Sequence, residues 1–375
     1  MIWTELTGLG LLAIWLLILA WPWQAWRVRE TLAARSAPAS PEQEQLAARL
    51  SIIIPARDEA TTIGRTLAAL NRQRLCCPVY LVDDNSSDGT AKVARQAGYP
   101  NLTLINGEPL PEGWTGKLWA QQQALPHVTT PLTLLIDADI ELKPGIIEAM
   151  VSKLDNEQLD LVSLMARLNM SGFWEHLLIP AFIHFFKLVY PFAWANQPQS
   201  RMAAAAGGCI LVKTEQLTAI GGFAALRNAI IDDCTLARRV KVQGGKTWLG
   251  LTHDVASHRS YTRLEEIWQM VARTAYSQLN YSPLLLALCT VAMLALYWSP
   301  LMLALLGQLS LAMVIYGCIS LSYLPVLRYY QKSSLWALTL PPTALLYLAM
   351  TWSSAWRFWR GERSQWKGRR YSINS

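Results

Sequence analysis

The sequence predicts an α/β fold, a doubly wound sheet joined to transmembrane helices, and two observations predict it. Within residues 48–260, apolar runs that suit strands alternate with runs that suit helices, as in a doubly wound sheet. Long runs without charge lie on both sides of this region. Apolar residues make up 52% of the 375 residues and charged residues only 16%, against about 25% in typical soluble proteins. This composition excludes a disordered chain, a coiled coil and a collagen-like repeat, and it disfavours a purely soluble enzyme.

The N-terminal run covers residues 6–26, carries no charge and is about long enough to cross a bilayer. Arg27 and Arg29 follow at once, which places this end in the cytoplasm by the positive-inside rule. A cleaved signal peptide is disfavoured, because no basic region precedes the run and no small-residue cleavage site is clear. We therefore expect a transmembrane anchor over residues 1–29 and, from its Pro and Ser residues, a linker over residues 30–47.

Further charge-free runs follow the polar region. Residues 274–327 are too long for one span and suit two, with a break near Pro300 or Gly307. Another apolar run covers residues 333–356. The C-terminal transmembrane helices are expected within residues 283–357, which makes the protein multi-pass.

A basic tail over residues 358–375 closes the chain. Such a cluster beside an apolar span is typical of a cytoplasmic anchor near anionic lipid, although a solvated tail fits too. No nucleic-acid partner is expected, because no recognition motif accompanies the charge. Three spans would place the tail outside, whereas the positive-inside rule wants it inside. Either residues 333–356 lie in the interface or re-enter, or residues 274–327 cross only once.

Two more segments fit a membrane surface. Residues 173–195 are aromatic and apolar but contain Glu175, His184 and Lys187, which a spanning helix tolerates poorly. They suit an interfacial helix or a helix buried in the soluble domain. Residues 261–282 are expected to be an interfacial segment.

The polar region carries acidic residues at the ends of its predicted strands. Leu50–Ile54 reads as a buried parallel strand that Pro55 ends, and a helix follows from Thr61 or Thr62. Val79–Val82 reads as the next strand, and residues 132–140 contain a third. Ligands in such sheets bind beyond the carboxyl ends of the strands. Four carboxylates are expected at that edge: Asp83, Asp84, Asp137 and Asp139.

These carboxylates suit the chemistry of a nucleotide and a metal. The Asp137-Ala138-Asp139 turn offers hard oxygen ligands for Mg²⁺ or Mn²⁺, which also bind phosphates. Asp83 and Asp84 are suited to accept hydrogen bonds from a nucleobase or ribose. Each motif alone is also an ordinary Asp-containing turn. Acidic residues at the ends of two strands in one alternating pattern are much harder to explain as ordinary turns.

A further acidic pair, Asp232-Asp233, stands at the start of a predicted helix. The helix dipole stabilises a carboxylate there, and such a group can act as general base towards an attacking hydroxyl. A plain helix N-cap is the alternative. His253 and His258 are interpreted as structural, since no Cys or acidic cluster stands at ligand spacing.

The order of these elements resembles family 2 glycosyltransferases of the GT-A fold, whose sheet is mixed. The resemblance covers about residues 50–260, and it narrows at PLPEGWTGKLWA, residues 109–120. Similar stretches occur in members that glycosylate membrane lipids such as carotenoids and hopanoids. The nearest resemblance is to hopanoid-biosynthesis-associated glycosyltransferases. The motifs that carry the resemblance are IIIPARDE (52–59), LVDDNSSDGT (81–90), LLIDADI (134–140), AAGGCILVKTEQLTAIGGF (205–223) and IDDCTLARRVKVQGGK (231–246).

The resemblance implies a role for each motif residue. Asp139 would be the direct metal ligand, with Asp137 beside it. Asp233 would be the catalytic base and Asp232 its neighbour. Lys117 would contact the diphosphate or the sugar, with a solvated surface lysine as the alternative. The uracil and ribose of a UDP-sugar would be contacted by Asp84, Asp83, Pro55 and Glu59.

The sequence departs from the family in two places. Asp58 stands where the family has Asn, which leaves its role open. The QxxRW motif of processive members is absent, because Gln269 and Arg273 stand one residue too far apart and no Trp follows. Arg273 is expected to contact the diphosphate from an interfacial helix. The missing motif favours the transfer of a single sugar over polysaccharide synthesis.

The sequence thus predicts a glycosyltransferase of the inner membrane with a cytoplasmic catalytic domain. It would move one sugar from a UDP-sugar to the hydroxyl of a lipid acceptor, a hopanoid or a similar isoprenoid, with inversion. One alternative is a polyprenyl-phosphate sugar synthase, whose phosphate nucleophile needs no strong base. Another is a non-catalytic membrane scaffold that keeps the fold.

Overall fold

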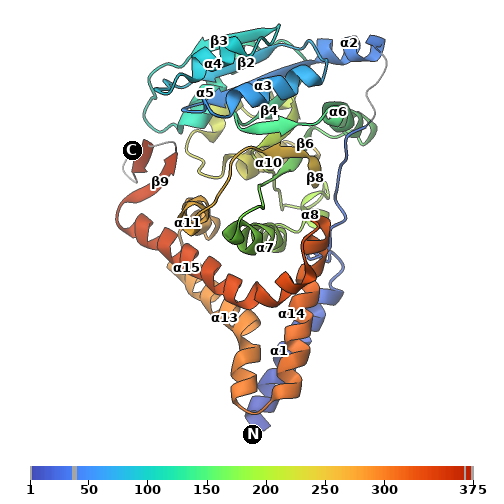
Figure 1. Cartoon of the computed structure of the whole chain (residues 1–375), viewed down its shortest axis with the longest axis vertical. Coiled ribbons are helices and arrows are strands. Elements are labelled where there is room, and N and C mark those ends of the chain that lie inside the picture. The colour runs from blue at the N-terminus through green and yellow to red at the C-terminus, as the bar shows by residue number, and fades with distance from the viewer. Residues whose placement is uncertain (1, 36–39, 367–368, 373–375) are drawn as a thin grey trace.

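A mixed eight-stranded sheet organises the α/β region (Figure 1). The computed structural model describes residues 2–35, 40–366 and 369–372. The strand order is β3-β2-β1-β4-β7-β6-β8-β5, in which β7 runs antiparallel to both its neighbours and β5 is antiparallel to β8. The doubly wound mixed sheet is confirmed. The strands are β1 (Leu50–Ala56), β2 (Val79–Asp83), β3 (Leu102–Asn106), β4 (Leu132–Ile136), β5 (Ile140–Leu142), β6 (Leu161–Arg167), β7 (Cys209–Lys213) and β8 (Thr247–Ser257).

Helices cover both faces of this sheet, and apolar side chains from helices and strands form the core between them. On α3, for example, Ile63, Leu67 and Leu70 are buried at helical spacing. The helices of the α/β region are α2 (Ser40–Arg49), α3 (Ile63–Arg72), α4 (Thr90–Gln96), α5 (Gly116–Ala124), α6 (Ile146–Asn156), α9 (Thr214–Ala219) and α10 (Asp232–Val242), with the short 3₁₀ helices η1 (Leu125–His127) and η2 (Gly222–Leu226).

Strand β1 runs through Pro55 rather than ending before it, so the expected strand end was wrong. Pro55 stands opposite Val82 in the ladder to β2. The backbone N–H of Ile52 points to β2, so the nitrogen of Pro55, three residues on, points the other way. The ladder to β4 already ends at Ile53 and Leu135. No partner strand therefore needs the N–H that proline lacks.

An apolar stem extends below the sheet, built from α1 (Ile2–Ala20), α13 (Pro283–Leu305) and α14 (Leu309–Tyr329) (Figure 1). Helices α13 and α14 are each long and apolar enough to cross a membrane. The turn between them contains Gly307 at φ +82°, so the break falls at the second of the two expected places. Helix α1 ends six residues short of the expected run, since Pro22 disfavours helical geometry in the residue before it.

Helix α15 (Leu340–Trp359) settles where the basic tail lies. Together with η3 (Ser334–Thr339) it is long and apolar enough to cross a membrane. In Figure 1, however, it runs across the upper end of the stem and packs on α13, α7 and α11. The backbone then forms a hairpin of β9 (Glu362–Trp366) and β10 (Arg369–Ser372) beside the α/β region. The described part of the tail therefore lies on the same side of the stem as the sheet, which agrees with the alternative in which residues 333–356 lie in the interface.

Four short or amphipathic helices separate the sheet from the stem: α7 (Phe173–Val189), α8 (Phe192–Ala195), α11 (Leu264–Ala272) and α12 (Ala275–Gln278). The two charged side chains of α7, Glu175 and Lys187, are buried and have partners, whereas the ring nitrogens of His184 have none in the described structure. Glu175 accepts backbone N–H groups from Ser171, Gly172 and Tyr261, and Lys187 pairs with Glu30 at 3.4 Å. Charges satisfied in this way explain how an apolar segment can keep them buried.

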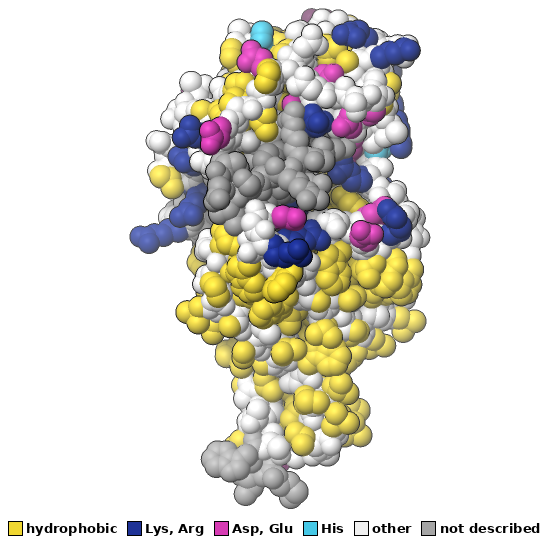
Figure 2. Space-filling model, turned by 90° about the vertical axis from the view of Figure 1, so that its left-hand side faces the viewer, with side chains coloured by type: hydrophobic (Ala, Val, Ile, Leu, Met, Phe, Trp, Pro, Cys, Tyr) yellow, Lys and Arg dark blue, Asp and Glu magenta, His cyan; other side chains and the backbone are white. Residues whose placement is uncertain are grey.

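The expected linker is ordered where the structure describes it. Its first part lies along β8, where Leu32 N–H bonds to Leu251 O and Ala34 N–H to Asp254. Its second part starts helix α2 at Ser40; residues 36–39 lie outside the described part. Figure 2 shows a dense field of hydrophobic side chains over the lower half, with Lys, Arg, Asp and Glu above it. This division is the one expected of a domain standing on a membrane surface.

Candidate active site

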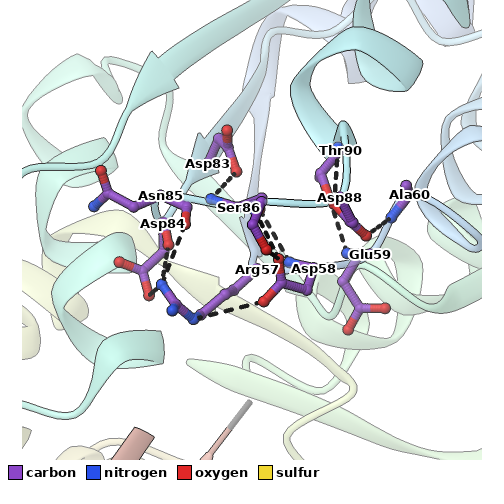
Figure 3. A network of polar contacts seen from close by, with 11 residues as sticks. Arg57, Asp58, Glu59, Ala60, Asp83, Asp84, Asn85, Ser86, Asp88 and Thr90 are labelled. Carbon is purple, nitrogen blue, oxygen red and sulfur yellow. Dashed lines mark hydrogen bonds and ion pairs between the residues drawn. The ribbon is translucent and has the colours of Figure 1, made fainter. Parts of the chain in front are cut away.

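Two loops at the carboxyl ends of β1 and β2 are tied together by side-chain hydrogen bonds (Figure 3). Ser86 accepts the N–H of Asp58 at 3.0 Å, and Asp58 accepts the N–H of Ser87 at 2.8 Å. Thr90 and Asp88 accept the next two N–H groups of the first loop, at 2.8 and 2.9 Å. Most polar side chains of the LVDDNSSDGT motif therefore hold the loops in place. The open question about Asp58 has a structural answer: its carboxylate positions the second loop.

Of the residues predicted to contact the uracil and ribose, Asp84 and Glu59 lie on these loops, Asp83 ends β2, and Pro55 lies in β1. Asp84 is almost fully buried, and its carboxylate lies 3.9 Å from the Arg57 guanidinium, which also donates to the Asp84 carbonyl at 2.6 Å. Asp83 is half-buried and accepts the N–H of Ser86. Glu59 is buried and accepts from Thr62 at 2.8 Å and from Arg259 at 3.0 Å. The contacts of these residues with a nucleotide remain predictions.

The Asp-x-Asp turn follows β4, and each of its carboxylates faces a cation. Asp137 lies 2.7 Å from the Lys117 ammonium. Asp139 accepts the Ser257 hydroxyl at 2.7 Å and lies 3.7 Å from the Arg259 guanidinium. Burial raises the pKa of Asp137, and the negative charge of Asp139 adds to that rise.

The acidic pair at the start of α10, Asp232 and Asp233, lies close to the same lysine, Lys117. Asp233 is half-buried and accepts the N–H of Gly207 and its neighbour Cys234, both at 2.7 Å. Asp232 lies 3.7 Å from Lys117. Lys117 is therefore not a surface lysine; it joins the Asp-x-Asp turn to the acidic pair. The sequence expectation that these groups share one site is consistent with this geometry.

Gly207 makes this approach possible. A Cβ at this position would lie 3.1 Å from the Lys117 ammonium and 3.2 Å from the Asp233 carboxylate. Both distances are tighter than ordinary contacts of a Cβ. Gly207 was part of a matched motif but received no role from the sequence, because only the folded chain brings it under both side chains.

The pKa of Asp233 suits a base that works near neutral pH. Burial and the adjacent charge of Asp232 raise it to about 6, against the opposing effect of Lys117. Burial lowers the pKa of Lys117, but Asp137 and Asp232 raise it by more, so Lys117 stays charged. Perturbed pairs of this kind are typical of functional sites.

Tyr190 and Gln278 approach Asp233 from the membrane side. The Tyr190 hydroxyl donates to Gln278 at 2.5 Å, and the charge of Asp233 contributes to raising the Tyr190 pKa, after burial and Cys234. Arg273 is exposed at the end of α11. Burial raises the pKa of Tyr261. The charge of Asp139 raises this pKa further, whereas the charge of Arg273 lowers it. The predicted contact of Arg273 with a diphosphate remains a prediction.

Comparison with known proteins identifies the family. A family model described as "Glycosyltransferase like family 2" matches residues 48–276. The chain belongs to this family. The expected family 2 membership is thereby confirmed, and the matched residues contain the nucleotide loops and the acidic cluster described above.

Similar proteins extend the comparison. The chain is 33% identical over 106 residues to 4,4'-diaponeurosporenoate glycosyltransferase of Staphylococcus aureus, and 30% identical over 112 residues to the enzyme of that name from Staphylococcus haemolyticus. These matches span 28% and 29% of the chain, and the same shares of the relatives. A mannosyltransferase from Pyrobaculum calidifontis, solved with GDP-Man and Mn²⁺, shares the fold at a TM-score of 0.55 and 18% identity, covering 94% of this chain and 99% of that one. These comparisons do not confirm the expected resemblance to hopanoid-biosynthesis-associated glycosyltransferases.

The glycosyltransferase site has the donor set for one divalent cation. Its four carboxylates, Asp137, Asp139, Asp232 and Asp233, face two cations, Lys117 and Arg259, and Arg259 also pairs with Glu59, so negative charge is in excess. The described residues hold no cluster of three or more His, Cys, Asp or Glu ligands. One or two carboxylates plus substrate phosphates are the usual ligands of Mg²⁺. Asp139 and Asp137 fit that mode of binding.

Arg259 is the main site residue that sequence reasoning missed. It bridges Glu59 on the nucleotide side and Asp139 in the acidic cluster. Its neighbours His253 and His258 drew attention instead. His253 stacks on Tyr329 at 4.1 Å between ring centroids, and His258 is buried 3.7 Å from Glu141, which agrees with structural roles.

Proposed function

We propose that this protein is a membrane-bound, inverting glycosyltransferase that moves one sugar from a UDP-sugar to the hydroxyl of an isoprenoid lipid such as a hopanoid. One observation carries the proposal: Asp233, with a pKa of about 6, shares a cluster with the Asp-x-Asp turn in a domain that an apolar stem joins. The carotenoid-type name of the Staphylococcus relatives supports a lipid acceptor.

The donor would lie across the carboxyl edge of the sheet. Asp84, Asp83, Pro55 and Glu59 would contact the uracil and ribose, and the diphosphate would reach Asp137 and Asp139. Mg²⁺ or Mn²⁺ bound at Asp139 and Asp137 would offset the negative charge that grows on the departing diphosphate. Lys117 and Arg273 would contribute positive charge to the same group.

Asp233 would act as the general base. The acceptor hydroxyl passes its proton to the Asp233 carboxylate, and its oxygen attacks the anomeric carbon from the face opposite UDP. The bond from that carbon to the diphosphate oxygen breaks, and UDP leaves with the electron pair. This single displacement inverts the configuration. The N–H groups of Gly207 and Cys234 hold the carboxylate in place, while Asp232 keeps its pKa near neutral pH.

The acceptor would enter from the bilayer between α7 and the segment of α11 and α12. Tyr190, at the end of α7, and Gln278, at the end of α12, bond to each other beside the acidic pair. Residues 173–195 and 260–282 would thus guide the apolar body of the lipid. The hydroxyl end would reach Asp233 while the rest of the molecule stays in the apolar phase.

The proposed setting is the inner membrane, with the catalytic domain in the cytoplasm. Arg27, Arg29 and Arg328 line one crevice at the domain end of the stem, which agrees with the positive-inside rule. In this arrangement α1, α13 and α14 cross the bilayer, whereas α15 lies along its surface.

Substitution of Asp233 tests the proposal directly. We expect Asp233→Asn, purified in detergent and supplied with labelled UDP-sugar, Mn²⁺ and extracted lipid, to lose about 10²- to 10⁴-fold in transfer rate. The matched control is Asp155→Asn, which removes an exposed carboxylate from α6 that pairs only with Arg49. It should retain wild-type transfer. Wild-type transfer by Asp233→Asn would remove Asp233 from the role of base.

A further inference from the structure

A second polar cavity, of about 550 Å³, lies outside the acidic cluster. It opens between the β5–β8 edge of the sheet and the end of α14. None of the four site aspartates lines it. The residues that bear on the argument are Arg65, Glu141, Lys143, Arg167, His258 and Lys332.

Positive charge is in excess in this cavity. Arg65, Lys143, Arg167 and Lys332 face a single lining carboxylate, Glu141, which already pairs with Arg72 at 2.7 Å. Lys143 pairs with Asp254. Within the described part of the chain, Arg65 and Arg167 form no ion pair with a carboxylate. Lys332 donates to the Met170 carbonyl and contacts His176 Nε2, neither of which carries a negative charge.

The cationic groups also act on one another. Burial lowers the pKa of Lys332, and the charge of Arg167 lowers it further. His258 Nε2 is buried and has no hydrogen-bond partner in the described structure. A concave site with surplus cations is suited to an anion.

The place of the cavity in the fold indicates where that anion comes from. Tyr330, Gln331 and Lys332 directly follow α14, one of the helices suited to cross the bilayer. Leu168 and Met170 add an apolar border. We propose that this cavity binds the phosphate group of an anionic membrane phospholipid, as basic pockets at the cytoplasmic ends of spanning helices do. This ligand is neither the sugar donor nor the acceptor.

A bound lipid would also steady the metal-binding turn. Ser257 lines the cavity and donates to the Asp139 carboxylate at 2.7 Å. The next N–H, that of His258, donates to the Asp139 carbonyl at 2.7 Å. Two residues of the cavity wall, Ser257 and His258, therefore hold Asp139 in place. We expect the rate of sugar transfer to rise when anionic lipid is present.

The test measures lipid binding by the full-length protein in detergent, by native mass spectrometry during titration with phosphatidylglycerol or phosphatidylcholine. We expect selective retention of phosphatidylglycerol. Arg167→Gln should raise its Kd about fivefold, the effect of one basic residue at a membrane surface. Arg65→Gln, on a different element, should do the same and covers the case in which the first variant does not fold.

The matched control is Arg328→Gln, which removes an exposed charge from the same end of α14 but outside this cavity. Its Kd should stay at the wild-type value. An equal loss in Arg328→Gln, or unchanged binding in both cavity variants, would overturn the proposal. A further arm adds millimolar inorganic phosphate. If it displaces nothing, a lipid-borne phosphate is supported; if it binds and phosphatidylglycerol does not, the site takes soluble phosphate and the lipid assignment fails. Lipid binding is measured without sugar transfer, so the outcome is independent of the proposed activity.

Discussion

Two polar regions lie at the same edge of the sheet, and they differ in how their charges are satisfied. In the loops after β1 and β2, side-chain oxygens accept backbone N–H groups one after another, as for Ser86, Asp88 and Thr90 (Figure 3). In the acidic cluster, four carboxylates share two cations, Lys117 and Arg259, among the described residues, and the pKa of Asp233 rises to about 6.

This difference indicates that the loops have a structural role and that the acidic cluster has a chemical one. A satisfied network contributes rigidity and loses stability when it is cut. A cluster in which like charges are held together is unfavourable for folding, and such strain is typical of places that bind a cation or move a proton. Substitutions in the cluster should therefore change rate more than stability, and substitutions in the loops should do the reverse.

The largest expected effect is that of Asp139→Asn. Removing the carboxylate that fits a divalent cation should lower transfer on the order of 1,000-fold, since a metal supplies several kcal/mol of charge stabilisation. Initial rates across a Mn²⁺ titration, together with thermal unfolding, check this. Glu157→Gln is the control, because it removes an exposed carboxylate at the end of α6 that pairs with Lys153. Equal losses in both variants would contradict the assignment of Asp139.

Gly207→Ala should have the next largest effect. The added methyl meets Lys117 and Asp233 at 3.1 and 3.2 Å, so each must move by a few tenths of an ångström. A displacement of about 1 Å at a reacting group costs about 100-fold in rate, so we expect this smaller shift to cost about tenfold. Transfer rates and circular dichroism check this. Gly317→Ala serves as control, since a Cβ there meets nothing within 4 Å. If Gly207→Ala keeps wild-type activity, the close approach has no catalytic importance.

The pH profile should show a smaller, graded effect. Asp233 accepts a proton only when ionised, so kcat/KM should fall about tenfold per pH unit below pH 6 and level off above it. Lys117→Gln removes a charge that lowers the Asp233 pKa, and the limb should then move to higher pH. Rates measured from about pH 5 to 8 check both. A limb that stays in place in Lys117→Gln would separate this lysine from the base.

Sequence reasoning reached the strand ends because they follow from local patterns. The apolar β-branched run of β1 and the runs of β2 and β4 mark buried strands, and Asp83, Asp84, Asp137 and Asp139 follow such runs directly. The carboxyl ends of parallel strands share one edge, so their proximity was foreseeable. Strand β3 escaped prediction, since half-buried edge strands such as this one carry a weaker apolar signal.

Other features depend on packing between distant segments. Arg259 reaches Glu59 across 200 residues of sequence, and no local pattern signals that pairing. The same holds for α15, whose length and hydropathy fit a membrane span. Its contacts with α7 and α11 set its direction instead. The length and composition of such a helix show that it could span a membrane, whereas its contacts with neighbouring helices determine its direction.

The smallest effect on rate should come from the loops, in Asp88→Ala. Asp88 accepts the N–H groups of Ala60 at 2.9 Å and Thr90 at 3.0 Å, so its loss should lower the free energy of unfolding by about 1–2 kcal/mol and leave kcat within about twofold. Burial raises the Asp88 pKa, but these hydrogen bonds lower it by more, to below 3.8. Its stabilisation is therefore present above pH 4 and lost in more acidic solution. Denaturant unfolding at pH 7 and pH 3 checks the sign: the gap between wild type and variant should narrow at pH 3, and a gap that widens there would show that these loops are not held by an ionised Asp88.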